Sequence, residues 1–466
     1  MTAPFLWIIL PIFFSILFLF FRKYYLLVCL FQISVCILIV FSGINSQLGF
    51  QASTSGGSLL KIEPEMNILG RSLIITPGLK TTLLLFYGFL GFWTIGLYIL
   101  KIKTNIAPLG LTFIGLLIAA LAVEPFLYSA LIIEIAVIIS VLMLSRDQTV
   151  GIEGISRLLV YFTIGMPFIL LAGWYLAGGE ITPVNDEQLI QATVLLGLGF
   201  VLWLAVFPFH TWVLLLSDES NPYEGLLILI LLPIAVVVLL LKYINGFAWL
   251  RGYEMVFQTL RLLGILMISM GSIWFPFQKN LKKATGYLLI VSTGVMITAI
   301  GLNSINGYIL TSYLILMRII GFSLLSWTLT ILKIKTDSTD IEALAGLFNH
   351  ELILAISIFA SLFTIVGMPL LGGFPVLQAL YSDLYSFEPR FSSLVIICIT
   401  ILSITILNWI LTSLKSEYNA ELLPTNISSN VFLLTCVILL FILGVFPNQI
   451  YPRISGIIDG FQFLIK

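Results

Sequence analysis

The feature that most constrains this chain is a long apolar run over residues 189–222 that is interrupted near its middle. Phe207-Pro208-Phe209-His210 breaks the run, and the polar segment Ser217-Asp218-Glu219-Ser220 ends it. Proline has no backbone N–H and kinks a helix. In lipid the carbonyl freed in this way needs another partner, so broken helices lie inside protein or beside water. The run therefore predicts a broken transmembrane helix inside a larger helical assembly.

A second apolar run, over residues 352–377, breaks in the same manner. It contains Gly367-Met368-Pro369, followed by Gly372-Gly373-Phe374-Pro375. Two interrupted helices in corresponding places are typical of a transport site between structural repeats. The pair of breaks therefore predicts a channel-like membrane subunit.

The composition agrees with a membrane protein. Of the 466 residues, 60% are hydrophobic and 9% are charged, and the mean hydropathy is +1.13; soluble domains carry roughly 25% charged residues. The 22 basic and 22 acidic residues cancel, so no basic field indicates nucleic acid as a partner. The four cysteines lie in apolar runs without C-x-x-C spacing, which favours neither a metal site nor a disulfide framework.

We predict an all-α integral membrane protein with about 14 transmembrane helices, since a span needs about 20 apolar residues. The first run is followed by Arg22-Lys23 but has no basic region before it and no cleavage site, so we expect a retained span rather than a signal peptide. The predicted spans are 4–21, 24–42, 81–100, 106–123, 126–145, 158–178, 189–216, 225–242, 256–275, 284–302, 307–333, 352–386, 391–413 and 430–446.

The loops indicate an orientation. Loops after odd-numbered spans hold more Lys and Arg than the opposite side, whose short loops after spans 4, 6 and 10 hold none. Because cytoplasmic loops accumulate basic residues, we expect both termini to face away from the cytoplasm. Residues 43–80 are polar with alternating apolar positions, and we expect an extramembrane hairpin or short sheet there.

The spacing of the two breaks predicts inverted repeats. If spans 4–8 and 9–13 form two units, Pro208 and Pro369 both fall in the fourth span of a unit. Five is odd, so consecutive units enter the membrane from opposite sides. The predicted divisions are 1–105 for the N-terminal helices 1–3 with the hairpin, 106–245 and 246–415 for the two five-helix repeats, and 416–466 for the C-terminal helix and tail.

Four motifs in order carry a family resemblance. Phe207-Pro208-Phe209-His210-Thr211-Trp212 resembles the F-P-F-H-x-W signature of the antiporter-like proton-pumping subunits of respiratory complex I. Leu281-Lys282-Lys283 with Gly286-Tyr287 resembles the family's L-K-R-x-x-A-Y helix start. The segment from Leu344 to Phe374 resembles L-x-G-L … G-L-P-P-L-A-G-F, and Gly444-Val445-Phe446-Pro447 resembles the closing G-x-x-P.

The resemblance, which covers roughly residues 120–450, also extends to related hydrogenase subunits and multisubunit sodium/proton antiporters. It implies 14 helices with two inverted five-helix repeats, each able to form a proton half-channel. It also implies assembly beside other membrane subunits of a redox or antiporter complex. No cofactor is expected to bind to this chain, because in such a complex the redox chemistry happens in other subunits.

Ionisable groups at membrane depth are costly and are functional hypotheses by default. Glu134 lies in the fifth span and matches the family's buried glutamate; it either switches its protonation state or simply bonds a neighbouring helix. His210 follows the first break, where it either relays protons or caps the carbonyls freed by Pro208.

Two basic residues complete the predicted proton pathway. Arg318 lies in the middle of a span, and its guanidinium does not lose its proton, so it either holds an anion or water or snorkels to an interface. Lys242 closes the eighth span, where we favour a helix-end anchor over a proton carrier.

Departures from the family pattern matter as much as the matches. The family's central lysine, seven residues before the histidine, corresponds to Trp203 here. The basic residue expected on the eighth span falls near Pro233-Ile234-Ala235, and the one expected on the second broken helix falls at Leu377, beside Gln378. Without a cationic partner, we expect Glu134 to stay neutral. An indole in place of a lysine tends to fill a cavity and exclude water.

Two interpretations follow from this pattern. Either water chains and residues such as Arg318 replace the lysines, or the subunit transmits or seals without pumping. We therefore expect a membrane-arm subunit of a complex I-type NADH:quinone oxidoreductase or a related redox-driven pump, with its own proton conduction weakened or absent. A free-standing secondary transporter is the alternative. The membrane would be a prokaryotic plasma membrane or an organellar inner or thylakoid membrane.

Overall fold

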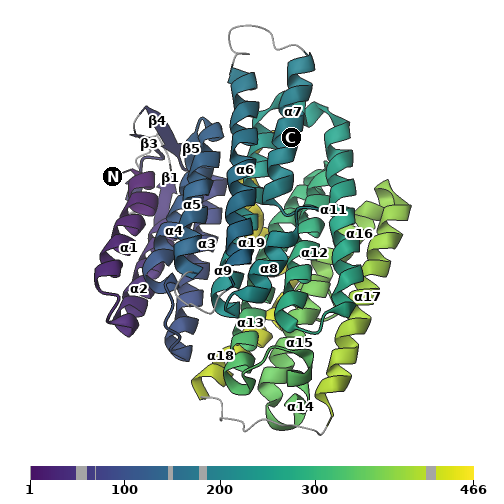
Figure 1. Cartoon of the computed structure of the whole chain (residues 1–466). Helices are drawn as coiled ribbons and strands as arrows, with labels where there is room; N and C mark the ends of the chain where they lie inside the picture. Colours follow the sequence, from purple (N-terminus) through teal and green to yellow (C-terminus); the bar gives the residue numbers. More distant parts are fainter. Residues whose placement is uncertain are drawn as a thin grey trace.

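The computed structural model of the chain describes residues 2–48, 60–68, 70–144, 151–177, 186–415 and 427–465. These residues form a bundle of long helices with a small patch of strands at one end (Figure 1). Long apolar runs form helices in lipid because a helix pairs its own backbone donors and acceptors, so no polar backbone group is left facing hydrocarbon. An all-α membrane fold is confirmed.

Ten helices of the described chain are long and apolar enough to cross a membrane, and four further apolar helices are shorter. All lie where spans were predicted, although the count of fourteen crossings stays a prediction. The helices of the first half are α1 (Leu10–Phe20), α2 (Tyr25–Asn45), α3 (Pro77–Leu100), α4 (Ile106–Ala122), α5 (Ser129–Leu144), α6 (Ile152–Ala177), α7 (Asp186–Trp203), α8 (Thr211–Glu219) and α9 (Pro222–Gly246).

The second half again contains long helices and one broken helix, together with several short helices. Its helices are α10 (Ala248–Gly252), α11 (Glu254–Trp274), α12 (Leu281–Gly301), α13 (Ile305–Thr336), α14 (Leu347–His350), α15 (Leu352–Val366), α16 (Gly373–Phe387), α17 (Pro389–Ser413), α18 (Ile427–Val445), α19 (Pro447–Ile454) and α20 (Gln462–Ile465).

Side-chain caps start several of these helices. Asn221 Oδ1 accepts a hydrogen bond from the Tyr223 N–H at the start of α9, and Pro222 occupies its first position. Asn280 and Ser304 cap α12 and α13 in the same way. Such caps satisfy backbone donors that have no partner within the helix. The polar residues that separate the apolar runs therefore fix where the spans begin.

Two small sheets lie between α2 and α3. Strands β1 (Ser46–Leu48) and β2 (Leu60–Ile62) pair in parallel. Strands β3 (Glu65–Ile68) and β4 (Arg71–Ile74) form an antiparallel hairpin, which matches the hairpin or short sheet predicted within residues 43–80. The short strand β5 (Val123–Glu124), after α4, extends this sheet by pairing with β4, which the sequence did not reveal.

Both broken helices are present, and they occupy opposite halves of the bundle. The first break separates α7 from α8, and the second separates α15 from α16. In Figure 1 the end of α6, which precedes α7, lies at the top, whereas α14, which precedes α15, lies at the bottom. The two pairs therefore enter the bundle from opposite ends, as inverted repeats require. The exact domain boundaries stay a prediction.

The bundle has two distinct ends. At one end, which we call the terminal face, Thr2 pairs with Glu63 and the Phe463 N–H donates to Asn245 Oδ1 at 3.0 Å. At the other end, which we call the opposite face, Asn280 pairs with Asp340. The first and last described segments thus lie on one side, as an even number of crossings predicts.

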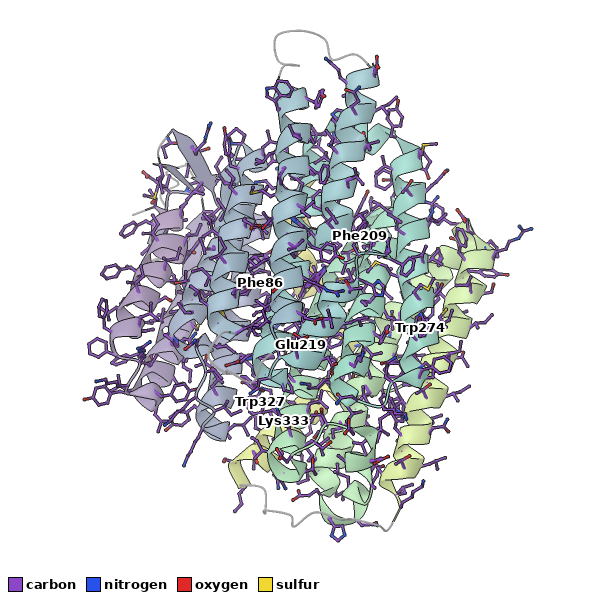
Figure 2. All side chains as sticks on the ribbon, viewed as in Figure 1. Phe86, Phe209, Glu219, Trp274, Trp327 and Lys333 are labelled. Carbon is purple, nitrogen blue, oxygen red and sulfur yellow. The ribbon has the colours of Figure 1, made fainter. Side chains whose placement is uncertain are left out.

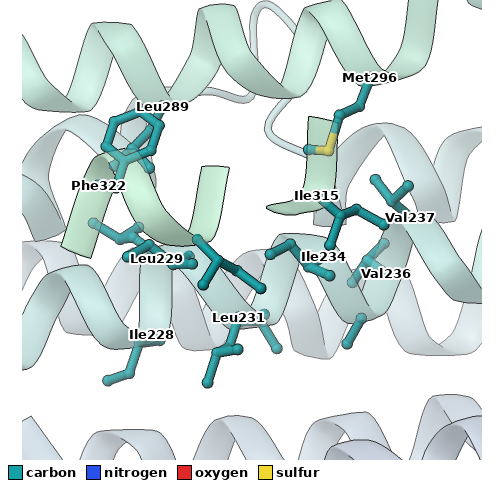
Figure 3. Packing of buried hydrophobic residues seen from close by; sticks show 14 of the residues in the cluster. Ile228, Leu229, Leu231, Ile234, Val236, Val237, Leu289, Met296, Ile315 and Phe322 are labelled. Atoms are coloured by element: carbon teal, nitrogen blue, oxygen red, sulfur yellow. The ribbon is translucent and has the colours of Figure 1, made fainter. Parts of the chain in front are cut away.

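Helix α9 forms the centre of the bundle. Every residue of its apolar window is buried, and it packs against α4, α12 and α13. Figure 3 shows Leu231, Ile234 and Val237 of α9 among side chains from α12 and α13. This helix therefore lies between the two halves and touches both of them.

Candidate functional site

The first break is a short irregular segment at mid-bundle. Helix α7 ends at Trp203 and α8 begins at Thr211, and the Phe207–Pro208 peptide bond between them is cis. Ala205 adopts a left-handed conformation with φ of 57°, and the Val206 N–H reaches back to the Val201 carbonyl at 3.0 Å. Figure 2 places Phe209 of this segment near mid-height of the bundle. The predicted interruption at Pro208 is confirmed.

Trp203, which stands where the family resemblance predicts a lysine, is packed inside the protein. Its side chain is fully buried, and its Nε1–H donates to the Phe162 carbonyl of α6 at 3.0 Å. The indole stacks on the Phe162 ring, with centroids 5.4 Å apart and planes 13° apart. A Cβ on Gly165 would lie 2.4 Å from Trp203 Nε1, so the indole lies directly on the α6 backbone.

Further aromatic rings surround this indole. Phe200 meets Trp203 edge-on at 6.4 Å, and Trp212 of α8 meets Phe162 edge-on at 5.6 Å. Edge-to-face and stacked pairs at these separations are favourable arrangements for aromatic side chains. We call Phe162, Phe200, Trp203 and Trp212 the aromatic cluster. It fills the space beside the first break with rings that carry no titratable group.

His210 bonds locally within the break. Its Nδ1 lies 3.2 Å from the Pro208 carbonyl oxygen, and its ring stacks on Phe207 at 5.2 Å. Within the described part of the chain it forms no ion pair. The carbonyl that it contacts belongs to Pro208 itself and is not one freed by the missing proline N–H, so both interpretations of His210 stay predictions.

Glu134 lies on α5 and faces α6. Thr163 Oγ1 donates to its Oε1 at 2.6 Å, while its Oε2 is buried without a hydrogen-bond partner. No ion pair to Glu134 occurs among the residues that the structure describes. The carboxyl therefore has a neutral hydroxyl as its neighbour, where the family resemblance led us to look for a cation.

Arg318 of α13 is buried, with 2% of its surface exposed. Its Nη2 donates to the Leu229 carbonyl of α9 at 2.8 Å, and its Nη1 contacts the Leu289 carbonyl and Thr293 Oγ1 of α12, each at 3.1 Å. The guanidinium also lies 5.6 Å from the Phe322 ring. It thus joins three helices and does not snorkel to an interface.

The bond from Arg318 to Leu229 has a simple cause in the sequence. In a helix the carbonyl of residue i accepts from the N–H of residue i+4. For Leu229 that partner is Pro233, which has no N–H. The guanidinium therefore supplies the donor that the proline removed. Pro233 and Arg318 stand close to the place where the family resemblance predicts a titratable residue on the eighth span.

Lys242 lies near the end of α9 that is at the terminal face of the bundle. Its Nζ forms an ion pair with Glu124 Oε1 at 2.8 Å and donates to the carbonyls of Leu121 and Val123 at 3.0 and 3.1 Å. These carbonyls lie at the end of α4, where a positive charge is favourable. The contacts agree with the helix-end anchor interpretation. A cavity of about 180 Å³ lies beside Lys242 and Glu124.

The second break is closed by small residues. Gly367 ends α15 with φ of 81°, and a Cβ there would lie 2.4 Å from Leu377 Cδ1. A Cβ on Gly373 would lie 1.9 Å from the Thr364 carbonyl oxygen. Leu377 is buried, and Pro369 lies in the non-helical turn between the two helices. The interruption predicted at Gly367 and Pro369 is confirmed.

The four predicted pathway residues do not meet. Glu134, His210, Arg318 and Lys242 bond to carbonyls, to threonines or to Glu124, and none bonds to another of the four. Between the Leu229 carbonyl and Lys242, α9 presents the apolar run 230–241, all of it buried. At 1.5 Å per residue this run is about 18 Å long. The four predicted residues therefore do not form a continuous chain of titratable side chains in the described structure.

Sequence reasoning missed two buried charged residues. Glu224 is 2% exposed in the first turn of α9, where the helix dipole favours a negative charge. Arg261 of α11 is 4% exposed and donates to the Gly301 carbonyl at 2.7 Å. The helix start Asn221-Pro222-Tyr223-Glu224 was a readable signal for the first. Among the described residues, no group of three or more His, Cys, Asp or Glu could hold a metal ion.

Comparison with known proteins places this geometry in context. Residues 180–407 match the family described as NADH:quinone oxidoreductase/Mrp antiporter, TM. NADH-quinone oxidoreductase subunit N 2 of Syntrophobacter fumaroxidans is 27% identical over 333 residues, which cover 66% of this chain and 68% of that protein. Chloroplastic NAD(P)H-quinone oxidoreductase subunit 2 of Mesostigma viride is 29% identical over 203 residues, which cover 41% of this chain and only 38% of that relative.

A solved structure extends the similarity to the whole chain. A chain of respiratory complex I from Thermus thermophilus with bound NADH superposes with a TM-score of 0.80 at 18% identity, covering 100% of both chains. At this identity the match establishes the fold. The broken helices described above therefore belong to a fold shared along the full length of that chain.

Proposed function

We propose that this chain, which belongs to the antiporter-like membrane subunit family of complex I-type NADH:quinone oxidoreductases and Mrp antiporters, is a non-pumping member of a redox-driven ion-translocating complex. It would fill one place in the membrane arm, join its neighbours and seal the membrane there. Proton translocation would take place in the other antiporter-like subunits of the complex.

The observation that carries this proposal is the burial of Trp203. The indole replaces the central lysine of the resemblance, bonds the Phe162 carbonyl and stacks on the Phe162 ring. A proton path needs titratable groups or water in sequence, and a buried indole offers neither. The apolar run 230–241 of α9 lengthens the interruption toward the terminal face.

Arg318 supports the same proposal. Its guanidinium keeps its proton, so it does not pass a proton by deprotonating. Its contacts to Leu229, Leu289 and Thr293 are those of a fixed link between helices. The residue provides a permanent positive charge where a pump would require one that comes and goes.

The kind of complex to which this subunit would belong is inferred from the names of the similar proteins. NADH-quinone oxidoreductase and respiratory complex I support a complex that couples electron transfer to proton movement, with other membrane subunits as partners and no cofactor in this chain. We propose a prokaryotic plasma membrane or an organellar inner or thylakoid membrane. The terminal face would point away from the cytoplasmic side, because basic residues are sparser in its loops.

A measurement of proton uptake in liposomes tests the proposal. The assembled complex is reconstituted, and redox-driven proton uptake per electron is compared for the wild type and Glu134→Gln. We expect an unchanged ratio, because among the described residues Thr163 is the hydrogen-bonding neighbour of Glu134, and no titratable side chain there bonds to this carboxyl. Glu187→Gln, an exposed carboxyl at the start of α7, serves as the matched control. A lower ratio in Glu134→Gln at normal assembly would contradict the proposal.

A free-standing secondary transporter is not favoured. Such a protein would need a polar substrate site at the breaks, and the first break is packed with the aromatic cluster while the second is closed by glycines and Leu377. Purification of the chain from native membranes should bring peripheral redox subunits with it. Recovery of the chain alone under mild detergent would support the transporter instead.

A further inference from the structure

Helix α16, which follows the second break, carries a polar stripe on its outer side. Figure 1 shows α16 beside α17 at one edge of the bundle. The exposed residues Gln378, Ser382 and Tyr385 are spaced by four and three positions, so they lie on one face of the helix. The buried side chains of α16 are apolar: Val376, Leu377, Leu380 and Leu384. The helix therefore turns its polar face away from this protein, although polar groups of membrane helices normally face other helices.

The first residue of this stripe lies inside the hydrocarbon layer. Helix α16 ends at Phe387, and the charged residues Glu388 and Arg390 follow at the start of the membrane-spanning helix α17. Gln378 precedes Phe387 by nine positions, or about 14 Å along the helix. Half of the hydrocarbon core is about 15 Å thick. Tyr385 lies nearer the membrane surface, where tyrosine is common, so the argument depends on Gln378.

The amide of Gln378 has unused hydrogen-bonding groups. It forms no hydrogen bond with another residue that the structure describes. A glutamine side chain offers two donors and one acceptor. Lipid tails can pair with neither kind of group, and a polar group left unpaired in hydrocarbon costs several kcal/mol. The exposed amide at this depth therefore requires a polar cover.

The irregular backbone before α16 is exposed as well. Pro369 and Leu370 both lie at the surface of the second break, and Leu370 is 64% exposed. Pro369 has no N–H to donate to the Ile365 carbonyl four residues earlier. In the hydrocarbon region, irregular backbone occurs only where protein or water covers it. The break and Gln378 thus independently exclude lipid as the cover of this side of the bundle.

We propose that the stripe of Gln378, Ser382 and Tyr385 is the docking surface for a transmembrane helix of a neighbouring subunit. That helix carries an uncharged hydroxyl or amide side chain opposite Gln378, because such a group can both donate to the amide and accept from it. Ala379 and Ser382 are small, and the Ser382 hydroxyl bonds to the Ala379 carbonyl at 2.8 Å. Small residues let a second helix approach closely. The proposal deepens the proposed function by naming where one neighbour binds.

Helix α17 provides the contrast at the same edge of the bundle. Its exposed residues in the middle of the span include Ile397, Ile404 and Leu407, which are 60%, 54% and 46% exposed. The hydroxyl of its exposed Thr400 donates to the Ile396 carbonyl of its own helix at 2.8 Å. This face of α17 can therefore lie against lipid, whereas the outer face of α16 cannot. We expect the neighbouring helix to cover α16 and to leave this face of α17 in lipid.

Photocrosslinking in the assembled complex tests the docking surface. The photoreactive amino acid p-benzoylphenylalanine replaces Tyr385, whose ring it resembles, or Ile397 as the control at a lipid-facing position. The purified complex is irradiated, digested and analysed by mass spectrometry. From position 385 we expect crosslinks to a membrane-spanning segment of another subunit. Their yield should be roughly tenfold higher than from position 397, which has no helix docked against it.

A second substitution tests the hydrogen bond. Gln378→Met keeps the length of the side chain and removes the amide. With the photoreactive group at position 385, this variant should lower the crosslink yield about fivefold, which is the effect of losing one hydrogen bond between helices. Thr400→Val should leave the yield unchanged, because this hydroxyl bonds within α17. An unchanged yield in Gln378→Met would overturn the proposal. If this variant does not enter the membrane, Ser382→Leu, whose side chain blocks close approach, takes its place.

Other results would also contradict the docking surface. Equal yields from positions 385 and 397, attachment to lipid alone, or attachment to a second copy of this chain would each overturn it. These results leave the proposed function intact as long as redox subunits copurify with the chain. Absence of the redox subunits from the preparation would contradict the proposed function instead, so the two failures can be told apart.

Discussion

The two broken helices occupy equivalent places in the fold but are closed by opposite means. At the first break, large rings fill the space: Trp203 stacks on Phe162 and bonds its carbonyl. At the second, glycines remove the space: Gly373 brings α16 against the Thr364 carbonyl, and Gly444 of α18 lies against the Leu370 carbonyl. The two breaks are thus packed differently, the first by the volume of aromatic rings and the second by close backbone contact.

This difference makes the two breaks respond to different mutations. A site closed by rings is sensitive to loss of volume, whereas a site closed by glycines is sensitive to any added atom.

Truncation of the Trp203 indole should lower the stability of the protein more than any other change considered. Trp203→Ala removes a fully buried side chain and its hydrogen bond to Phe162, so we expect a loss of about 4 kcal/mol in stability. The measurement is the thermal denaturation of the purified complex, compared with Trp174→Ala at an exposed position of α6. Equal stability of the two variants would mean that the aromatic cluster does not support the break.

Addition of one methyl group should disturb the second break. In Gly373→Ala the new Cβ would lie 1.9 Å from the Thr364 carbonyl, a backbone atom that no rotamer change can move. We expect a loss of about 3 kcal/mol, at the upper end for overpacked sites. The assembly level and the melting temperature report this loss. Gly197→Ala, into open space, is the matched control; a similar loss there would show that helix position, and not contact, decides the cost.

The effects of substitutions at Arg318 and Pro233 on stability should be coupled, because both residues determine whether the Leu229 carbonyl has a donor. Arg318→Met leaves the Leu229 carbonyl without a donor, so we expect a loss of about 2 kcal/mol. Pro233→Ala restores the backbone N–H that this carbonyl lacks. The double variant should therefore recover about 1 kcal/mol relative to Arg318→Met alone. Strictly additive effects in this double-mutant cycle would contradict the assignment of Arg318 as the substitute donor.

The smallest effect is expected away from both breaks, at Glu134. Thr163→Val removes the hydroxyl that donates to Glu134 Oε1, which should cost about 1 kcal/mol. The carboxyl stretching band of Glu134 in difference infrared spectra should shift as this bond is lost. Thr193→Val, whose hydroxyl bonds within its own helix, should leave the band in place. A shift in the control as well would assign the band to another group.

Much of this architecture was predictable from sequence, because its causes are local. Pro208 and the Gly367–Pro369 segment interrupt helices wherever they occur, and the apolar runs between polar caps locate the spans. The burial of Trp203 was expected from its size and setting. The strand β5 was not expected, since only the fold brings residues 123–124 beside β4.

The partners of the charged residues could not be predicted in this way. Pro233 signals that the Leu229 carbonyl lacks its donor, but the sequence does not say that Arg318, 89 residues away, supplies it. The same holds for Lys242, whose partner Glu124 lies more than a hundred residues earlier in the chain. Each depends on which helices pack together, and in lipid, apolar helix faces of similar composition give little indication of their partners.

The burial of α9 has a consequence for how this chain is made. Helix α9 has the highest mean hydropathy of the ten described helices that are long enough to span a membrane, so it can enter a bilayer on its own, yet in the folded protein its apolar window is fully buried. Lipid tails are as apolar as the side chains of α9, so the hydrophobic effect contributes no free energy when α9 leaves lipid to be enclosed by other helices. Hydrogen bonds at its backbone carbonyls, from Ser326 to Pro222 and from Arg318 to Leu229, can therefore favour the enclosed state. Both donors belong to α13, which follows α9 in the chain, so the hydrogen bonds that favour the enclosed state of α9 can form only after α13 has been synthesised.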